Sequence, residues 1–210
     1  MIRCSVEAVH RIVKLELKPL TPDRWDDLVE LFGRPGASIA RGCYCMCYRR
    51  SGRHEIPVGV TYSEDNKRSL KALVDRGIVP GLLGYEKGRT VGWVSLGPRG
   101  DYAKLARSPV MKPVDEKPVW SIVCFFVDAK ARHRGVAEAL LQGATAWAAK
   151  QGATLLEAYP CDKPEGGVDD FMWFGAKPMF DRAGFVEVAR RKPTRPVMRR
   201  PLRAASDRTR

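Results

Sequence analysis

Arg132-His133-Arg134-Gly135-Val136-Ala137 lies between two contrasting patterns of hydrophobicity. The residues before it, Trp120 to Val127, form a nearly continuous apolar run, which is typical of a strand buried on both faces. After it, apolar residues recur at helical spacing as far as Lys150. A second short apolar strand is expected at 154–159. Strand, helix and strand in this order predict a right-handed crossover between two parallel strands.

The hexapeptide itself has the chemistry of a pyrophosphate site. A helix begins with about four backbone N–H groups that have no partner within the helix, and with a partial positive charge. Gly135 and Ala137 allow an anion to approach these groups, and Arg132 and Arg134 add charge. The alternative is an ordinary strand-to-helix turn with surface arginines. The chain has no Gly-x-Gly-x-x-Gly series and no Walker-type Gly-Lys-Ser/Thr, which disfavours hydride transfer and nucleotide hydrolysis.

The other elements are predicted from periodicity and turn residues. Strands are expected at 12–17, in a hairpin of 81–86 and 90–96, and at 185–189 and 196–199. Helices are expected to begin at Thr21 and Ser63 and to cover about 174–182. Irregular chain is expected at 43–60 and 98–118. We assign residues 12–202 to one domain, 1–11 to an N-terminal extension and 203–210 to a basic tail.

Composition places the chain among ordinary globular proteins. Hydrophobic residues make up 44% of its 210 residues and charged residues 29%. It shows no apolar run long enough to span a bilayer and no secretory signal, so we expect no membrane partner and a cytoplasmic location. The six cysteines are then expected to be reduced thiols.

Positive charge is concentrated near the C-terminus. The formal net charge is +13, and from residue 190 onward nine basic residues face only Asp207, which gives nine minus one, or +8. Such a segment could contact a polyanion, although a solvated basic edge is the simpler interpretation. Because aromatic and basic residues are not interleaved in it, we regard nucleic acid as an unlikely partner.

At the hexapeptide the sequence resembles the GNAT superfamily of N-acetyltransferases. The family's acetyl-CoA motif is Gln/Arg-x-x-Gly-x-Gly/Ala, which Arg132-x-x-Gly135-x-Ala137 matches. The segment 84–94 looks like the family's central hairpin, and 180–185 like its final helix-to-strand turn. The resemblance implies an α/β (α+β) fold: a mixed central sheet of about seven strands, with a splayed parallel pair, flanked by about four helices.

The resemblance also implies a function. It predicts an acetyl-CoA-dependent N-acetyltransferase that moves an acetyl group to a primary amine by direct attack in a ternary complex. The acceptor would be a small-molecule or peptide amine, no metal is expected, and a homodimer is possible. A non-catalytic acyl-CoA-binding or nucleic-acid-binding protein with the same fold is the alternative.

Site residues follow from the same resemblance. Pantetheine would lie along Phe126 and Val127, where a backbone N–H polarises the thioester carbonyl. The pyrophosphate contacts would come from the hexapeptide: Arg132, His133, Arg134, Gly135, Val136 and Ala137. Phe180 occupies the position at which many members carry a tyrosine that protonates the leaving thiolate, and we count it among the cofactor-binding residues. The connection between the first two helices would line the acceptor pocket through Tyr44, Met46 and Tyr48.

Acid–base chemistry needs other residues, because phenylalanine donates no proton. Alternation along the strand at 154–159 puts Glu157 and Tyr159 on one face, and we take them as the candidate base and acid. Asp128 is a second candidate base, and either carboxylate could instead be a surface or capping group. Cys43, Cys45 and Cys47 alternate in a spacing that is unusual for zinc, so small thiols packed inside are the simpler interpretation.

Overall fold

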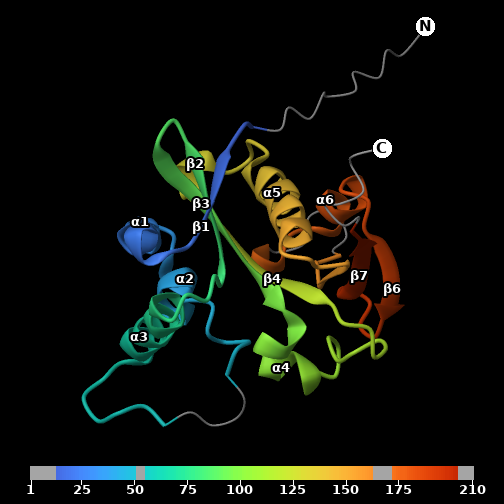
Figure 1. The fold of residues 1–210 in the computed structure, drawn as a ribbon, viewed down its shortest axis with the longest axis horizontal. Coiled ribbons are helices and arrows are strands. Elements are labelled where there is room, and N and C mark those ends of the chain that lie inside the picture. Colours follow the sequence, from blue (N-terminus) through green and yellow to red (C-terminus); the bar gives the residue numbers. More distant parts are fainter. Residues whose placement is uncertain (1–12, 51–54, 163–171, 203–210) are drawn as a thin grey trace, which may run out of the picture.

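The structure is a computed structural model that describes residues 13–50, 55–162 and 172–202 (Figure 1). A seven-stranded sheet runs through it in the order β1-β2-β3-β4-β5-β7-β6, in which only β4 and β5 are parallel. The strands are β1 (Glu16–Pro19), β2 (Gly81–Glu86), β3 (Arg89–Pro98), β4 (Trp120–Val127), β5 (Leu155–Ala158), β6 (Val186–Arg190) and β7 (Pro196–Pro201). The predicted mixed α/β fold and the parallel crossover are thus confirmed.

Six α-helices accompany the sheet in the described part of the chain: α1 (Trp25–Gly33), α2 (Ser38–Cys43), α3 (Tyr62–Asp75), α4 (Ala103–Ala106), α5 (Val136–Lys150) and α6 (Lys177–Arg182). Helices α2 and α4 fall in segments where no helix was expected, because each is too short to show a hydrophobic period. Within the described residues, no helix is long and apolar enough to cross a membrane. The proposed extension 1–11 and tail 203–210 lie outside these residues.

The first strand begins later than its alternation predicts. Residues from 12 were expected in it, but the ladder with β2 starts at Glu16, opposite Tyr85. Continued in the same register, Val13 and Lys14 would lie beyond Glu86, the last residue of β2. The apolar residues Val13, Leu15 and Leu17 nevertheless all pack against the main hydrophobic core.

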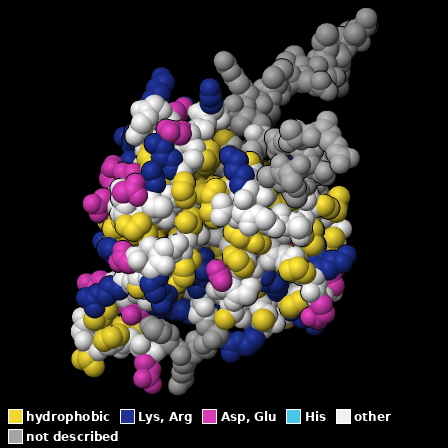
Figure 2. Space-filling view, viewed as in Figure 1, with side chains coloured by type: hydrophobic (Ala, Val, Ile, Leu, Met, Phe, Trp, Pro, Cys, Tyr) yellow, Lys and Arg dark blue, Asp and Glu magenta, His cyan; other side chains and the backbone are white. Residues whose placement is uncertain are grey.

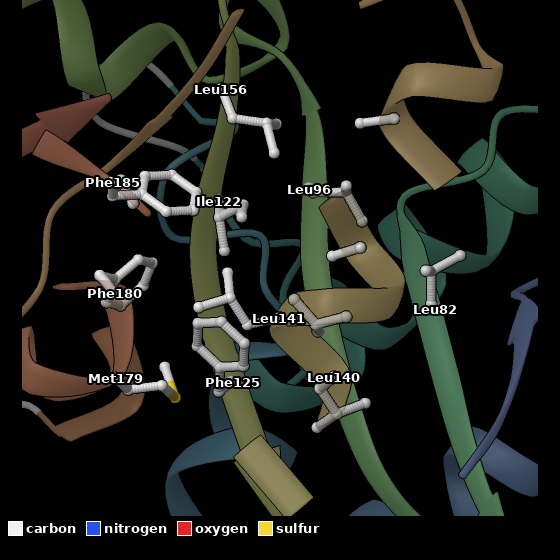
Figure 3. Packing of buried hydrophobic residues seen from close by; sticks show 14 of the residues in the cluster. Leu82, Leu96, Ile122, Phe125, Leu140, Leu141, Leu156, Met179, Phe180 and Phe185 are labelled. Atoms are coloured by element: carbon white, nitrogen blue, oxygen red, sulfur yellow. The ribbon is translucent and has the colours of Figure 1, made fainter. Parts of the chain in front are cut away.

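Alternation along the strands divides the apolar side chains between two layers. Leu82 and Val94 point to the α5 side, whereas their neighbours Leu83 and Trp93 point to the side covered by α1, α2 and α3. Figure 1 shows these three helices gathered together, away from α5. Figure 3 shows the α5 layer, in which leucines of that helix meet Ile122, and Phe125 of the same strand faces α6.

Glycines let α5 approach the sheet closely. A Cβ atom on Gly92 of β3 would lie 2.8 Å from a methyl of Leu140, and one on Gly143 would lie 2.5 Å from Cγ of Leu17. Both distances are shorter than carbon atoms tolerate, so a side chain at either position would push the helix from the strands. These two glycines therefore set the distance between the sheet and α5, the helix that begins at the hexapeptide.

A β-bulge in β4 shapes the centre of the sheet. Against β3, Ser95 pairs with Cys124 and Leu96 pairs with Ile122, so Val123 is an extra residue without a partner. Parallel pairing with β5 covers only Trp120, Ser121 and Ile122 and ends where the bulge begins. Since a bulge bends its strand, the second half of β4 diverges from β5, as the family resemblance implied.

We predict that Gly143→Ala destabilises the fold although alanine is the better helix former. The lost close packing on Leu17 should lower the free energy of unfolding by about 1–3 kcal/mol, more than the ~1 kcal/mol gained in helix propensity. Urea denaturation followed by circular dichroism measures this change. Gly33→Ala is the matched control: Gly33 also lies in a helix, but nothing lies within 4 Å of its added Cβ, so its stability should stay or rise. A stabilised Gly143→Ala would contradict the packing argument.

Candidate functional site

The hexapeptide forms a tight turn between β4 and α5. After a short 3-10 turn at Ala129–Ala131, His133 and Gly135 take positive φ values of 59° and 77°. Gly135 is the N-cap of α5, and within the described residues no side chain caps it. The first N–H groups of this fifteen-residue helix are thus open to an external acceptor. The local geometry is that of an anion-binding helix start.

Side chains around this turn divide into exposed cations and buried anchors. Arg132, His133 and Arg134 are exposed; Nε of Arg132 donates to the carbonyl of Val127 at 3.3 Å, and Arg134 forms an ion pair with Glu86. Val136 is 2% exposed and packs in the core beside Leu140, and Ala137 is half-buried. The Val136 side chain packs in the core and holds the helix in place, so only its backbone N–H can contact a ligand.

Asp128 fixes the start of the same turn. One carboxylate oxygen accepts from Arg34 at 2.6 Å and from Arg89 at 3.1 Å, and the other accepts from the N–H of Lys130 at 3.0 Å. Burial alone would favour the neutral acid, but the Lys130 amide and the guanidinium of Arg34 hold the pKa of Asp128 below its usual value. Asp128 is a buried anchor here. Arg34 and Arg89 lie far away in sequence, and no pattern pointed to them.

The splayed half of β4 leads from the bulge to this turn. Phe126 is half-buried, and its ring meets Phe32 of α1 edge to face at 5.6 Å. Among the residues that the structure describes, none pairs with residues 123–127 on the β5 side. Backbone groups on that edge can therefore bond an extended ligand, as pantetheine would require. Phe126 and Val127, the two residues expected to bind pantetheine, both lie in this part of β4.

Phe180 lies in the core behind this segment and has no exposed surface. Its ring meets Phe125 at 6.1 Å and Phe185 at 5.2 Å, both edge to face (Figure 3). A Cβ on Gly175 would lie 3.0 Å from the same ring. The side chain thus supports β4 from the α6 side, and its link to a ligand there would pass through Phe125.

Glu157 and Tyr159 are brought together as their alternation predicts, and the tyrosine hydroxyl donates to Oε1 of Glu157 at 2.6 Å. Both residues are fully buried. Arg99 donates to the same carboxylate and to the Tyr159 oxygen, while Nε of Arg199 donates to Oε2 at 2.7 Å. Burial, together with the Glu157 charge, raises the pKa of Tyr159 well above its usual value. Every oxygen of the pair is already engaged within the fold.

The same two arginines tie the loop after α4 to the sheet. Nη2 of Arg99 donates to the carbonyl of Met111 at 2.7 Å, and Nη1 of Arg199 meets Asp115 at 2.7 Å. Ser121 of β4 completes the network with an oxygen–oxygen distance of 3.0 Å to Tyr159. Neither arginine was singled out from the sequence, because long-range partners of a buried carboxylate leave no local pattern.

A cavity of about 650 Å³ opens between the chain after α2 and the loop after α4. Its walls include Cys47, Tyr48, Ile56, Lys104, Arg107 and Met111. Of the three residues expected to line the acceptor pocket, only Tyr48 borders this cavity. Tyr44 and Met46 are buried in the layer under α1 and α3, where Tyr44 meets the ring of Phe32 at 5.3 Å.

Tyr48 connects the cavity to the splayed strand. Its ring meets Phe174 at 5.5 Å, in the 3-10 turn Met172–Phe174 that packs against β4. Tyr48 also packs against the same hydrophobic cluster as Cys124, which lies on the diverging half of β4. Burial raises the pKa of Tyr48, so its phenol stays protonated at neutral pH. Through Tyr48, the cavity wall therefore adjoins the diverging half of β4.

The basic C-terminal segment uses much of its charge within the fold. Arg190 pairs with Glu187 and Asp162, and Arg191 donates to the carbonyls of Val110, Lys112 and Pro113. Arg195 lies 4.4 Å from the centre of the Phe174 ring. On the face in Figure 2, acidic and basic side chains are interspersed. Much of the positive charge counted in the sequence thus stabilises β6, β7 and their loops.

Comparisons with known proteins agree with this geometry. Residues 44–165, more than half of the chain, match the model of the acetyltransferase (GNAT) family. No curated protein matches the sequence. An acetyltransferase from Thermus thermophilus has 21% identity and a TM-score of 0.50, with 91% of this chain and 99% of that chain covered. The GNAT domain of S. lividans PAT has 18% identity and a TM-score of 0.53, with 90% of each chain covered.

A third solved structure extends the same picture. It is described as the histone acetyltransferase HPA2 and related acetyltransferase from Corynebacterium glutamicum ATCC 13032; it has 15% identity and a TM-score of 0.53, and the match covers 92% of this chain and 99% of that one. At these identities the solved structures support the fold alone. The family match, together with the uncapped helix after a splayed strand, shows that the chain belongs to the acetyltransferase (GNAT) family.

Proposed function

We propose that the chain is an acetyl-CoA-dependent N-acetyltransferase that moves an acetyl group to a primary amine by direct attack in a ternary complex. The observation that carries the proposal is the continuous path from the diverging edge of β4 to the uncapped start of α5. A long ligand with an extended arm and a pyrophosphate fits such a path, because the arm needs backbone partners and the anion needs free N–H groups.

The residues present fit acetyl-CoA at both ends of this path. The N–H groups from Gly135 to Ala137 would hold the pyrophosphate, with Arg132 and Arg134 beside it. The backbone at Phe126 and Val127 would hold the pantetheine arm and offer an N–H to the carbonyl. Acetyl-CoA supplies the activated acyl group. The chain's own task is to orient the carbonyl and to keep the acceptor amine within reach.

The cavity beside Tyr48 is the acceptor site in this proposal. It adjoins the diverging half of β4 through Tyr48 and Phe174. An attacking amine must be neutral, whereas a lysine-like amine has a reference pKa of about 10.4. Arg107 in the cavity wall favours the neutral form, because a like charge disfavours protonation of a nearby amine. Water in the open cavity can take the released proton.

The burial of Glu157 and Tyr159 points to positioning roles. Glu157 has no free oxygen for an incoming proton, because arginines and Tyr159 engage both. A tyrosine whose pKa lies well above the usual value is also a poor proton donor to a thiolate. We therefore propose that the pair holds β4, β5 and the loop with Met111 in place, and that it makes no direct contact with the reacting atoms.

The alternative, a non-catalytic protein that keeps the fold, finds less support. It rested on Phe180 and on the basic C-terminal segment. Phe180 belongs to the core behind β4, Arg199 is buried against Glu157, and Arg190 and Arg195 have partners at the surface of the fold. Neither Phe180 nor the basic C-terminal segment therefore favours a non-catalytic function over acyl transfer.

The first test is a screen of amine acceptors. Purified protein with acetyl-CoA should release free thiol faster than spontaneous hydrolysis with at least one amine, and mass spectrometry should find the acetylated product. An Ile56→Trp variant, which narrows the cavity, should reduce turnover at least about tenfold while binding of acetyl-CoA stays unchanged. Ile78→Trp is the control, because Ile78 is exposed and is not part of the cavity wall. Binding of acetyl-CoA without turnover for any amine would favour the non-catalytic alternative.

A matched pair of glycines tests the pyrophosphate site. Gly135 and Gly152 lie at the two ends of α5 and both have positive φ, at 77° and 83°. Gly135→Glu places a negative charge where the pyrophosphate should bind, so affinity for acetyl-CoA should fall at least about tenfold, or about 1.4 kcal/mol. Gly152→Glu carries the same backbone strain and charge at the far end, and should bind as the parent does. Isothermal titration calorimetry distinguishes them, and equal affinities would place the pyrophosphate elsewhere.

Tyr159→Phe separates positioning from catalysis. If the hydroxyl only supports the network, kcat should fall less than about fivefold and the pH profile of kcat should keep its shape, although stability drops by about 1–3 kcal/mol. A catalytic acid would instead cost about 100-fold or more in kcat and change the alkaline limb of the profile. Steady-state kinetics and thermal unfolding on the same preparation measure both quantities.

A further inference from the structure

We propose that Cys43 and Cys47 form a dithiol at the wall of the cavity that hydrogen peroxide oxidises to a disulfide. This modification site is independent of the acetyl transfer proposed above. It rests on the tight turn between Cys43 and Cys47, on Lys104 beside the Cys47 sulfur and on access to Cys47 from the cavity.

The turn after α2 places the two sulfurs together. Cys43 is the last residue of α2, and the next two residues, Tyr44 and Cys45, both have positive φ, at 43° and 53°. This left-handed pair folds the chain back, with the N–H of Met46 bonded to the carbonyl of Cys43 at 2.9 Å. The chain thus reverses within the segment from Cys43 to Cys47, and each of the two thiols shifts the pKa of the other. A disulfide can join two cysteines whose side chains are brought to the same side of such a turn.

The surroundings give the two sulfurs different roles. The interaction with Cys43 lowers the pKa of Cys47 to about 6, against the opposing effect of burial, and Lys104 contributes from 3.4 Å. The same interaction, burial and the neighbouring thiols raise the pKa of Cys43. Tyr48, whose phenol stays protonated, is the other titratable group beside Cys47. Cys47 is thus a thiolate at neutral pH, and Cys43 is the thiol that resolves its oxidised form.

Among the cysteines of the described residues, Cys47 is the one that a small oxidant can reach from the cavity. Cys47 is half-buried and belongs to the cavity wall. Cys45 is hydrogen-bonded to Cys124, accepts from the indole of Trp93 at 3.2 Å, and is buried away from the cavity. Cys161 is 3% exposed. Within the described residues no three metal-ligating side chains are arranged to hold an ion.

The chemistry balances with peroxide as the only co-reactant. The Cys47 thiolate attacks one peroxide oxygen; an S–O bond forms, the O–O bond breaks, and the departing hydroxide takes up a proton to become water. Cys43 then loses its proton and attacks the sulfenic sulfur; an S–S bond forms, the S–O bond breaks, and a second water leaves. Two thiols lose two electrons in total, and one peroxide gains them. The product leaves Lys104 without its thiolate partner in the cavity wall.

The test treats the full chain with a small excess of hydrogen peroxide. Free thiols are then alkylated, and the protein is cleaved after Tyr44, which lies between the two cysteines. Tandem mass spectrometry should find Cys43 linked to Cys47 in the parent and in the control Cys161→Ser. Cys43→Ser should leave Cys47 as a sulfenic acid that a 1,3-dicarbonyl probe captures, and Cys47→Ser should give neither product.

A second measurement does not depend on disulfide formation. The rate at which iodoacetamide alkylates Cys47 should rise with pH around a midpoint of about 6 in the parent. Both Lys104→Met and Cys43→Ser should move that midpoint upward, because each removes a group that stabilises the thiolate. A parent midpoint near that of an ordinary thiol, about 8.5, would overturn the proposal. So would a disulfide that forms between Cys45 and Cys124 while Cys43 and Cys47 stay reduced.

Discussion

Three residue pairs are all that join β4 to β5, and the extra residue Val123 explains why the ladder stops there. A bulge forces its strand to bend and leaves backbone groups without partners. In most sheets that would be a loss of stability, since unpaired backbone groups next to the core are costly. Here the second half of β4 gains an open edge that ends at the start of α5. The proposed cofactor path runs along this half of β4, and the proposed acceptor cavity adjoins it through Tyr48 and Phe174.

Two buried carboxylates hold the strand on either side of the divergence. Glu157, opposite Ser121, is bonded by Arg99 and Arg199 where β4 still pairs with β5. Asp128, directly after β4, is bonded by Arg34 from the end of α1 and by Arg89 from the hairpin. A buried ion pair often adds little net stability, but breaking one leaves an uncompensated charge that costs about 3–5 kcal/mol. Such pairs therefore fix geometry more than they stabilise, and between them β4 is free to face a ligand.

Local patterns in the sequence were sufficient for most of the fold. The apolar run at β4, the period of α5 and the hairpin of β2 and β3 each depend on neighbours within a few residues. What could not be predicted depends on distant contacts. Helices α2 and α4 are short and are held by packing, and the bulge at Val123 appears only when the register with β3 is known. The family resemblance, not periodicity, predicted the splay.

The site shows the same division. The hexapeptide could be proposed from the sequence because the function predicted for it depends on a local turn and on backbone N–H groups, and the structure has such a turn at the start of α5. Glu157 and Tyr159 were correctly paired by strand alternation, yet nothing in the sequence revealed Arg99 and Arg199, which engage them from elsewhere in the fold. In the same way, alternation could not show that Tyr44 and Met46 turn into the α1 layer while Tyr48 borders the cavity. A left-handed pair of residues at Tyr44 and Cys45 sets these directions, and no glycine marks it in the sequence.

The presence of Phe180 in place of a tyrosine becomes understandable when the proton transfers are compared. A phenol with a pKa of about 10 is a weaker acid than a thiol with one of about 8.5, so protonating the leaving thiolate from tyrosine is uphill by about 2 kcal/mol. Removing the proton from a lysine-like ammonium at pH 7 is the larger requirement, about 4.6 kcal/mol. Cationic groups around the amine reduce that cost, since they disfavour its charged form. If the proposed cavity takes the amine, Arg107 in its wall reduces this larger cost, and the position behind β4 can hold a phenylalanine whose ring meets Phe125 edge to face.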